Sequence, residues 1–286
     1  MKAASFAYLR PADLDSALDA LAEHGEEAKV LAGGQSLVPM LNLRLARPGV
    51  LVDINRIGLD EIALDGDVLV LGGLVRHVAL ERDPVVAREA PLLARAAPLI
   101  GHAAIRNRGT VAGSLAHADP AAELGAVALA LDAVVVARSA GGERAIPATE
   151  LFESPFSTTL RPDELITAVR FPRHGSWACA YQEMAIRAGD FAVAGAAVVL
   201  RLADGERVGE ARIALSGVAG VPVRATEAEA VLTGAPLDEE HVAAAARAAA
   251  DAARPSGDVH GSADYRRHLA GVLTRRALLD AARGGP

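Results

Sequence analysis

The sequence is poor in cysteine and lysine. Its single cysteine, Cys179, excludes a disulfide within this chain and an iron–sulfur cluster held by this chain alone. The neighbours of Cys179 in segment 177–181 are apolar, which predicts a packed thiol rather than a nucleophile. The only lysines are Lys2 and Lys29, so the chain lacks the lysine that follows the last glycine of a P-loop.

Long apolar runs and basic runs are absent as well. No segment approaches the ~18 consecutive apolar residues of a membrane-spanning helix. Arg10-Pro11 follows the N-terminal stretch too early for a signal peptide. The formal net charge of -7 at pH 7 argues against a surface that binds nucleic acid. We therefore expect a cytoplasmic protein with no transmembrane segment and no nucleic-acid partner.

Two common ligand motifs are also missing. Nowhere are two glycines separated by one residue, so the Rossmann fingerprint for dinucleotides is absent. None of the eight histidines has the paired spacing of a zinc-binding helix, and we predict no metal site. His102 and His117 flank a glycine turn, where they either contact a ligand or have ordinary exposed or capping roles.

The chain does have ample apolar sequence, arranged in short runs. Its 286 residues are 51% hydrophobic and 23% charged, enough for two or three domains with buried cores. We expect helices at 11–21, 35–45, 75–82, 85–100 and 121–131, with Pro91 and Pro98 breaking or kinking the fourth. We expect strands at 30–32, 50–55, 133–138 and 165–171, and a hairpin over 61–71 around Asp65-Gly66.

The last third has a different pattern. Strands are predicted at 178–186, 192–202 and 210–216, with a hairpin turn at Asp204-Gly205. Alanine-rich helices are predicted at 226–232, 241–253 and 263–279. Strands followed by helices indicate an α+β module and place a domain boundary near His174.

A glycine pair interrupts the apolar sequence at residues 28–37. Val30-Leu31-Ala32 predicts a buried strand, Gly33-Gly34 a turn, and Gln35-Ser36 the start of a helix. Successive backbone N–H groups in such a turn, next to a helix N-terminus, form a site for an anion. An ordinary strand-to-helix turn without a ligand has the same pattern, so both interpretations stay open at this point.

A second glycine turn at 109–114 favours the ligand. Two such turns could converge on the two phosphates of a pyrophosphate. Each hydrogen bond to a charged group contributes roughly 1.5–3 kcal/mol to binding. Four or five of them would anchor a dinucleotide without lysine or arginine. Asp119 would repel a phosphate, so it suits a ribose hydroxyl, a helix cap or both. Further side-chain donors would be Gln35, Ser36, Thr110 and Ser114.

These segments are similar to those of a known family. Residues 32–37 (Ala-Gly-Gly-Gln-Ser-Leu) and 106–120, which include Arg-Asn-Arg-Gly-Thr-Val-Ala-Gly-Ser, closely resemble the FAD-binding medium subunit of aerobic, molybdenum-containing carbon monoxide dehydrogenases and their xanthine dehydrogenase relatives. The resemblance covers the whole chain, including residues 187–192. Two departures are Ala112-Gly113-Ser114, where the family often has Gly-Gly-Asn, and the absence of a lysine near residues 181–184.

The resemblance implies an α+β fold with an FAD-binding domain of the vanillyl-alcohol-oxidase (PCMH-like) type. Two α/β subdomains would span residues 1–55 and 56–174, and a C-terminal domain at 175–286 would contain a three-stranded antiparallel sheet and helices. FAD would lie between the two subdomains. Its pyrophosphate would lie on residues 32–36 and 110–114, and Phe191 would lie near the flavin or pack in the core. The implied cofactor-binding residues are Ala32, Gly33, Gly34, Gln35, Ser36, Leu37, Thr110, Val111, Ala112, Gly113, Ser114, Asp119, Asp190 and Phe191.

The resemblance also implies an electron-transfer subunit with no catalytic side chains of its own. FAD would receive electrons from two [2Fe-2S] clusters in a small subunit and pass them to an external acceptor such as a quinone. A large subunit with the molybdenum cofactor would oxidise the substrate, by family analogy carbon monoxide. The implied assembly is a heterohexamer, a dimer of heterotrimers, in the cytoplasm or at the inner face of the membrane.

Two other functions remain open. A self-sufficient FAD oxidase would need a substrate pocket and an acid–base pair, and the sequence has no obvious pair. A non-catalytic assembly or ligand-binding subunit that has lost its flavin is suggested by Ala112 and the missing lysine.

Overall fold

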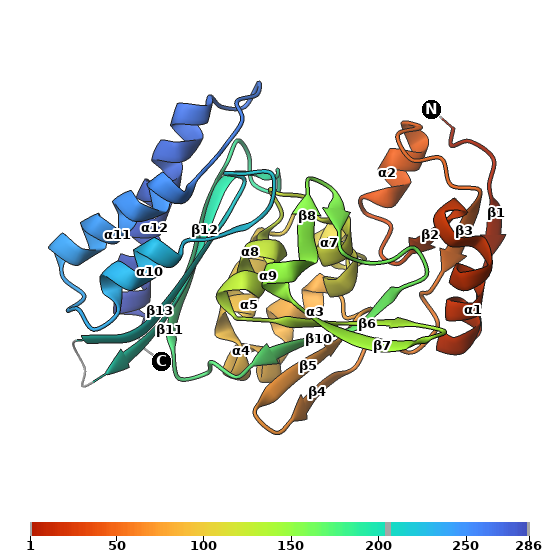
Figure 1. The fold of residues 1–286 in the computed structure, drawn as a ribbon, viewed down its shortest axis with the longest axis horizontal. Helices are drawn as coiled ribbons and strands as arrows, with labels where there is room; N and C mark the ends of the chain where they lie inside the picture. The colour runs from red at the N-terminus through yellow and green to blue at the C-terminus, as the bar shows by residue number, and fades with distance from the viewer. Residues whose placement is uncertain (1, 204–206, 285–286) are drawn as a thin grey trace.

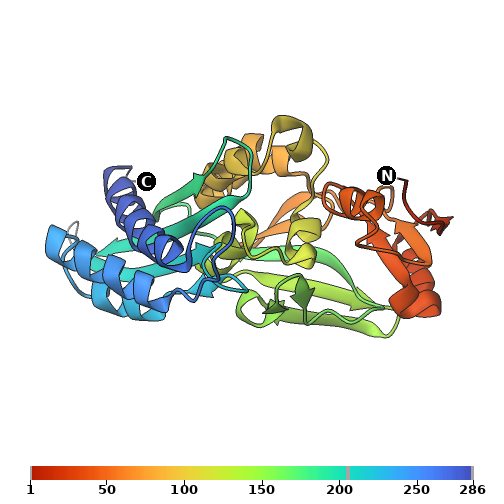
Figure 2. The same cartoon turned by 90° about the horizontal axis from the view of Figure 1, so that it is seen from above.

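Three sheets of three to five strands follow one another along the long axis of the molecule (Figure 1). The computed structural model describes residues 2–203 and 207–284. The N-terminal part (residues 2–55), the middle part (56–174) and the C-terminal part (175–284) occupy successive positions along this axis, and the view from above shows the same order (Figure 2).

The N-terminal part is a parallel sheet with two helices. Its strands β1 (Ala7–Leu9), β2 (Ala28–Leu31) and β3 (Val50–Asp53) have the order β1-β3-β2. The strand predicted at 30–32 is β2, and its predicted bounds are wrong. The predicted burial is also wrong, because β2 is an edge strand whose C-terminal residues are only half-buried.

The helices of this part differ from the predicted ranges at their ends. Helix α1 (Leu14–His24) begins after Asp13, whose carboxylate accepts the Ser16 N–H and caps it. A 3₁₀ turn (Gly25–Glu27) follows. Helix α2 (Leu37–Asn42) is shorter than predicted, because the backbone of Arg44 turns to a φ of 60°.

The middle part has a five-stranded antiparallel sheet with helices on one side. The sheet order is β4-β5-β10-β6-β7, and the predicted hairpin at Asp65-Gly66 joins β4 to β5. Its strands are β4 (Ile62–Asp65), β5 (Val68–Gly72), β6 (Val134–Ser139), β7 (Gly142–Pro147) and β10 (Leu165–Pro172), and a small separate hairpin is formed by β8 (Phe152–Ser154) and β9 (Ser157–Thr158).

Short helices connect these strands. The helix predicted at 85–100 is three pieces, because Pro91 and Pro98 each lie at the start of a new one. The helix predicted at 121–131 begins two residues later, at Glu123. The helices are α3 (His77–Arg82), α4 (Pro84–Glu89), α5 (Pro91–Ala96), the 3₁₀ turn Ala97–Leu99, α6 (Ala103–Arg106), α7 (Val111–His117), α8 (Glu123–Ala130) and α9 (Ala148–Leu151).

The C-terminal part has an antiparallel sheet covered on its outer face by helices (Figure 1). The three long strands implied by the resemblance are β11 (Ala178–Ala185), β12 (Ala192–Ala203) and β13 (Arg207–Ser216), and a short fourth strand, β14 (Val223–Arg224), extends the sheet. The hairpin turn predicted at Asp204-Gly205 lies outside the described residues. The helices are α10 (Thr226–Leu232), α11 (Glu239–Ala252) and α12 (Ala263–Arg283).

The C-terminal sheet shares its inner face with the middle part. Cys179, Tyr181 and Val199 belong to the same apolar cluster as Leu93 and Val127 of the middle part. The opposite face packs on α10, α11 and α12 in a second cluster, and the N-terminal part has a smaller third one. Residues 192–200 of β12 are therefore all buried, as in a strand covered on both faces.

Candidate cofactor site

The two glycine turns lie against each other, although they come from different parts of the chain. A Cβ added to Gly33 would lie 2.3 Å from the carbonyl oxygen of Arg108 and 2.8 Å from the Cα of Gly109. A Cβ added to Gly113 would lie 3.8 Å from the Cβ of Ala32. The β2–α2 turn can approach the α6–α7 segment this closely only because Gly33 has no side chain.

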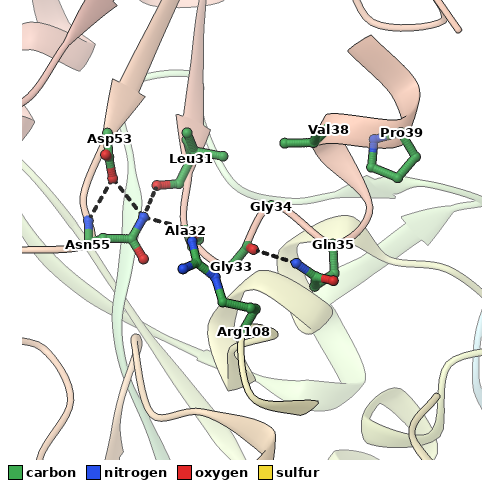
Figure 3. Close-up of a pocket in the computed structure, with 10 residues that line it drawn as sticks. All are labelled: Leu31, Ala32, Gly33, Gly34, Gln35, Val38, Pro39, Asp53, Asn55 and Arg108. Atoms are coloured by element: carbon green, nitrogen blue, oxygen red, sulfur yellow. Dashed lines mark hydrogen bonds between the residues drawn. The ribbon is translucent and has the colours of Figure 1, made fainter. Parts of the chain in front are cut away.

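A cavity of about 420 Å³ opens beside the first turn (Figure 3). The carboxyl ends of β2 and β3 border it, because neighbouring parallel strands end at the same edge of a sheet. Both apolar and polar side chains line it. The lining residues are Leu31, Ala32, Gly33, Gly34, Gln35, Val38, Pro39, Asp53, Asn55 and Arg108.

The first turn presents unused backbone donors. Within residues 2–203 and 207–284, the N–H groups of Gly33, Gly34, Gln35 and Ser36 have no hydrogen-bond acceptor in the chain. Gly34 has a φ of 72°, and the Gln35 side-chain amide donates to the Gly33 carbonyl at 3.0 Å, which fixes the turn. Successive free N–H groups in a turn with one left-handed residue suit an anion.

The second turn does not supply the other half of this set of donors. The N–H groups of Val111 and Ala112 donate to the carbonyls of Val75 and Gly73 at 3.0 and 3.3 Å, and that of Ser114 donates to the Thr110 carbonyl at 3.0 Å. The Gly113 N–H donates to the Thr110 hydroxyl oxygen at 3.1 Å and so caps α7. The expectation that these amides are free for phosphate is therefore wrong.

The remaining role of residues 110–114 in cofactor binding stays a prediction. It would fall to their side chains and to the Thr110 N–H, which has no acceptor within residues 2–203 and 207–284. The described side chains that line the cavity come from other segments. Ala112 lies inside α7 and is not among the positive-φ residues, so replacing the family's glycine with alanine needs no strained backbone.

A buried histidine holds the second turn in place. His77 donates from its backbone N–H to the Gly109 carbonyl at 3.0 Å, and its Nε2 lies 2.9 Å from the Thr110 carbonyl. Since a carbonyl only accepts, Nε2 carries the proton. Burial lowers the pKa of His77 to about 4, so the ring is neutral at pH 7. We did not predict this histidine, because only its tertiary contacts distinguish it from the others.

Two polar residues at the C-terminal end of β3, Asp53 within the strand and Asn55 after it, brace the first turn. Asn55 donates from Nδ2 to the Ala32 carbonyl at 2.8 Å and to Asp53 Oδ1 at 2.6 Å. Burial raises the pKa of the Asp53 carboxyl, but hydrogen bonds from Tyr8 and Asn55 outweigh it and hold the pKa below its usual range. These residues were missed from the sequence, although their place at the end of a predicted strand was a usable signal.

Three other predicted residues, Ser36, Leu37 and Asp119, do not line the cavity. Ser36 occupies the N-cap position of α2, but its side chain makes no capping hydrogen bond, and Leu37 is the first residue of that helix. Asp119 accepts the Ala121 N–H at 2.9 Å and caps a turn before α8 rather than the helix itself. A role for Asp119 toward a ribose stays a prediction.

The loop between β11 and β12 is exposed. Phe191 is 63% exposed, so the alternative that it packs in the core is wrong. A Cβ added to Gly189 would lie 2.3 Å from the His102 ring, so the loop rests on this histidine. Neither Asp190 nor Phe191 lines the cavity, and their contact with a flavin stays a prediction.

A separate polar cluster lies between α8 and the C-terminal sheet. The register of β11, β12 and β13 places Tyr181, Glu183 and Ser216 on one face, with Gly195 between them. Burial raises the pKa of Glu183 to about 8, with a further contribution from Glu123, whose own pKa burial raises to about 7. This acidic pair was not evident in the sequence, and it lies outside the cavity.

The described residues contain no group of three or more metal-ligating side chains. In the same residues, no helix is both long enough and apolar enough to cross a membrane.

Comparison with known proteins identifies similar sequences over almost the whole chain. The family described as the FAD-binding domain in molybdopterin dehydrogenase matches residues 4–174, and the C-terminal domain of CO dehydrogenase flavoproteins matches residues 179–281. The chain is 45% identical to the 6-hydroxypseudooxynicotine dehydrogenase complex subunit alpha of Paenarthrobacter nicotinovorans, covering 98% of this chain and 96% of the relative.

Solved structures of similar proteins have the same fold. A chain of carbon monoxide dehydrogenase from Hydrogenophaga pseudoflava superposes with a TM-score of 0.97 at 39% identity, covering 100% of both chains. A chain of quinoline 2-oxidoreductase from Pseudomonas putida 86 superposes with a TM-score of 0.94 at 38% identity, covering 99% of both.

Proposed function

This chain belongs to the family of FAD-binding medium subunits of molybdenum-containing dehydrogenases. We propose that it transfers electrons from an iron–sulfur partner subunit to an external acceptor. It is an FAD-binding oxidoreductase subunit with the two-domain composition of CO dehydrogenase flavoproteins. The main support is the cavity at the first turn, where four consecutive N–H groups have no acceptor in the part of the chain that the structure describes.

The residues at this cavity fit FAD. The free N–H groups of Gly33 to Ser36 suit phosphate oxygens, and the apolar side chains of Leu31, Val38 and Pro39 suit the flat surface of a base or ring. Asp53 and Asn55 offer polar atoms at the far side. The position of the flavin ring between the N-terminal and middle parts is part of this proposal.

The chain's own contribution is to bind and orient the cofactor. When bound, FAD supplies the redox chemistry, since a flavin accepts electrons singly and releases them singly or in pairs. With Cys179 as its only cysteine, the chain has too few thiolates to ligate an iron–sulfur cluster. The proposed electron donor is therefore a small subunit with two [2Fe-2S] clusters.

The proposed assembly also contains a large subunit with the molybdenum cofactor. We propose a heterohexamer made of two such heterotrimers, located in the cytoplasm or at the inner face of the membrane, with a quinone as the acceptor. The substrate would be oxidised in the large subunit, so the residues of this chain do not select it.

Carbon monoxide is the substrate that the family analogy favours. A second candidate is an aromatic nitrogen heterocycle, supported by the 45% identity to the 6-hydroxypseudooxynicotine dehydrogenase subunit and by the likeness to quinoline 2-oxidoreductase. Isolating the complex and assaying it with carbon monoxide and with quinoline decides between them.

Anaerobic reduction experiments test the electron-transfer function. We expect the purified chain with FAD to keep its visible flavin absorption when substrate is added alone, and to lose it when substrate is added together with both partner subunits. Bleaching by substrate without the partners would instead indicate a self-sufficient oxidase. A chain that stays colourless after incubation with FAD would indicate an assembly subunit.

A further inference from the structure

Arg108 brings a positive charge to the cavity. Figure 3 shows its side chain beside the Ala32-Gly33 segment, on the cavity side. Within the described ranges 2–203 and 207–284, the Arg108 guanidinium makes no ion pair and no hydrogen bond, and it is exposed. Asp53, which also lines the cavity, makes no ion pair with Arg108; its carboxylate accepts hydrogen bonds from Tyr8 and Asn55 and lies 4.0 Å from Arg10 Nε.

The neighbouring Arg106 is different. Its Nε pairs with Glu81 at 2.9 Å, and its Nη1 donates to the Gly101 carbonyl at 2.8 Å. Arg106 is thus occupied in holding α6 to α3. Of the two arginines before the second glycine turn, Arg108 is the one with its hydrogen-bond donors free for a ligand.

The backbone of Arg108 is held at the cavity from two sides. Its carbonyl oxygen accepts a hydrogen bond from Arg76 Nη1 at 2.6 Å, and the same oxygen lies against Gly33. Arg76 also donates from Nη2 to Asn55 Oδ1 at 2.8 Å. Since Asn55 in turn donates to the Ala32 carbonyl, Arg76 links both turns through one planar group.

We propose that Arg108 binds the diphosphate of the cofactor as its cationic ligand, and that Arg76 is a positioning residue that holds Arg108 in place. The proposal rests on the FAD site argued above. A guanidinium can bind a phosphate through two parallel hydrogen bonds, while the free N–H groups of residues 33–36 bind the remaining oxygens. The proposal adds an arginine to the backbone N–H groups and hydroxyls, which we expected from the sequence to be sufficient to anchor a dinucleotide.

Ligand titrations of the full apo chain test the proposal. FAD, ADP and riboflavin are titrated by calorimetry into the wild type, Arg108→Gln and Arg108→Lys, with Arg247→Gln as the matched control. Arg247 is an exposed arginine on α11 without an ion pair among the described residues, so its loss changes the net charge equally.

We expect Arg108→Gln to weaken FAD and ADP binding by about ten- to a hundredfold, the usual effect of one charged hydrogen bond. Arg108→Lys should retain part of the affinity, Arg247→Gln all of it, and riboflavin should bind every variant equally because it lacks phosphate. If Arg108→Gln binds FAD and ADP as tightly as the wild type, the proposal is overturned.

The remaining outcomes distinguish a failure of the proposal about Arg108 from a failure of the proposed FAD site. If the wild type binds ADP through Arg108 but does not bind FAD, the role of Arg108 stands and the FAD site is contradicted. If neither ligand binds, both fail.

A double-variant cycle tests the role of Arg76. If Arg76 acts through Arg108, the double variant Arg76→Gln/Arg108→Gln binds FAD no more weakly than Arg108→Gln alone. Additive losses would contradict the proposal that Arg76 acts through Arg108, because Arg76 would then act on the ligand directly or through Asn55 and the first turn.

Discussion

Gly34 is the residue of the cofactor site whose backbone is hardest for any other amino acid to adopt. Its φ is 72°, and an added Cβ would lie 3.2 Å from both Leu31 Cδ1 and Val38 Cγ2. A side chain there costs roughly 1–2 kcal/mol in backbone conformation and disturbs the apolar wall of the cavity.

We therefore expect Gly34→Ala to lower the free energy of unfolding by about 1–2 kcal/mol and to weaken FAD binding. Gly66→Ala is the matched control, because Gly66 has a φ of 57° in the β4–β5 turn and open space around it. The control should lose similar stability, measured by urea unfolding, and keep its FAD affinity. Equal FAD affinity in both variants would contradict the role of Gly34.

The buried His77 predicts a pH dependence of stability. Its pKa is about 4 in the folded chain and 6.5 in the unfolded chain, so the unfolded chain binds more protons between these values. Stability from this residue is complete above pH 6.5 and is lost as the pH falls to about 4, in total roughly 3 kcal/mol.

His77→Gln removes this titration and keeps a side-chain N–H that can reach the Thr110 carbonyl. Urea unfolding of both proteins at pH 7 and pH 4.5 measures the effect. The wild type should lose more stability than the variant on acidification, and an equal loss in both would show that His77 does not titrate as expected.

Which residues line the site was only partly predictable at this scale. Gly33, Gly34 and Gln35 could be identified, because a glycine pair between a strand and a helix leaves a local signal. Arg108 could not, since its place at the cavity depends on how separate segments pack. Asn55 was missed, although it lies at the end of a predicted strand. The second turn looked equivalent to the first, but its N–H groups are paired by Val75 and Gly73, which only the tertiary structure brings there.

Among the elements, helix α7 depends on a single capping residue. Thr110 is buried, and its hydroxyl oxygen accepts the Gly113 N–H at 3.1 Å. Thr110→Val keeps the shape of the side chain and leaves that N–H without an acceptor, which should cost about 1 kcal/mol of stability. Thr110→Ser keeps the hydroxyl and should lose much less. Equal losses on thermal unfolding would mean that packing, and not the cap, stabilises this helix.

The positions of helices and strands were predicted well where hydrophobic periodicity was strong. Their first and last residues were predicted less well. Helix α10 has the predicted bounds, Thr226–Leu232. By contrast, α11 begins at Glu239 because Asp238 accepts the His241 N–H. The sequence has several polar residues that could cap a helix, so it does not show where the helix begins.

In the whole molecule, a shared apolar core holds the middle and C-terminal parts together. The division of the chain at residues 55 and 174 stays a prediction, but apolar residues from both sides of residue 174 form one cluster. Arg212 on β13 also pairs with Asp132 at 2.9 Å and lies 2.8 Å from His174.

We therefore expect a chain cut by limited proteolysis between residues 172 and 178 to remain associated. Size-exclusion chromatography of the cut protein should give one peak with both fragments, because separation would expose the shared core to water. Two peaks under native conditions would contradict a shared core.

We propose above all that this chain binds FAD by its diphosphate in the cavity beside Gly33 to Gln35. Calorimetric titration of the purified apo chain with FAD, alone and in the presence of ADP, is the decisive experiment. We expect one FAD per chain, with ADP competing for the site and riboflavin not displacing ADP. Failure to bind FAD, or binding that ADP leaves unchanged, would contradict it.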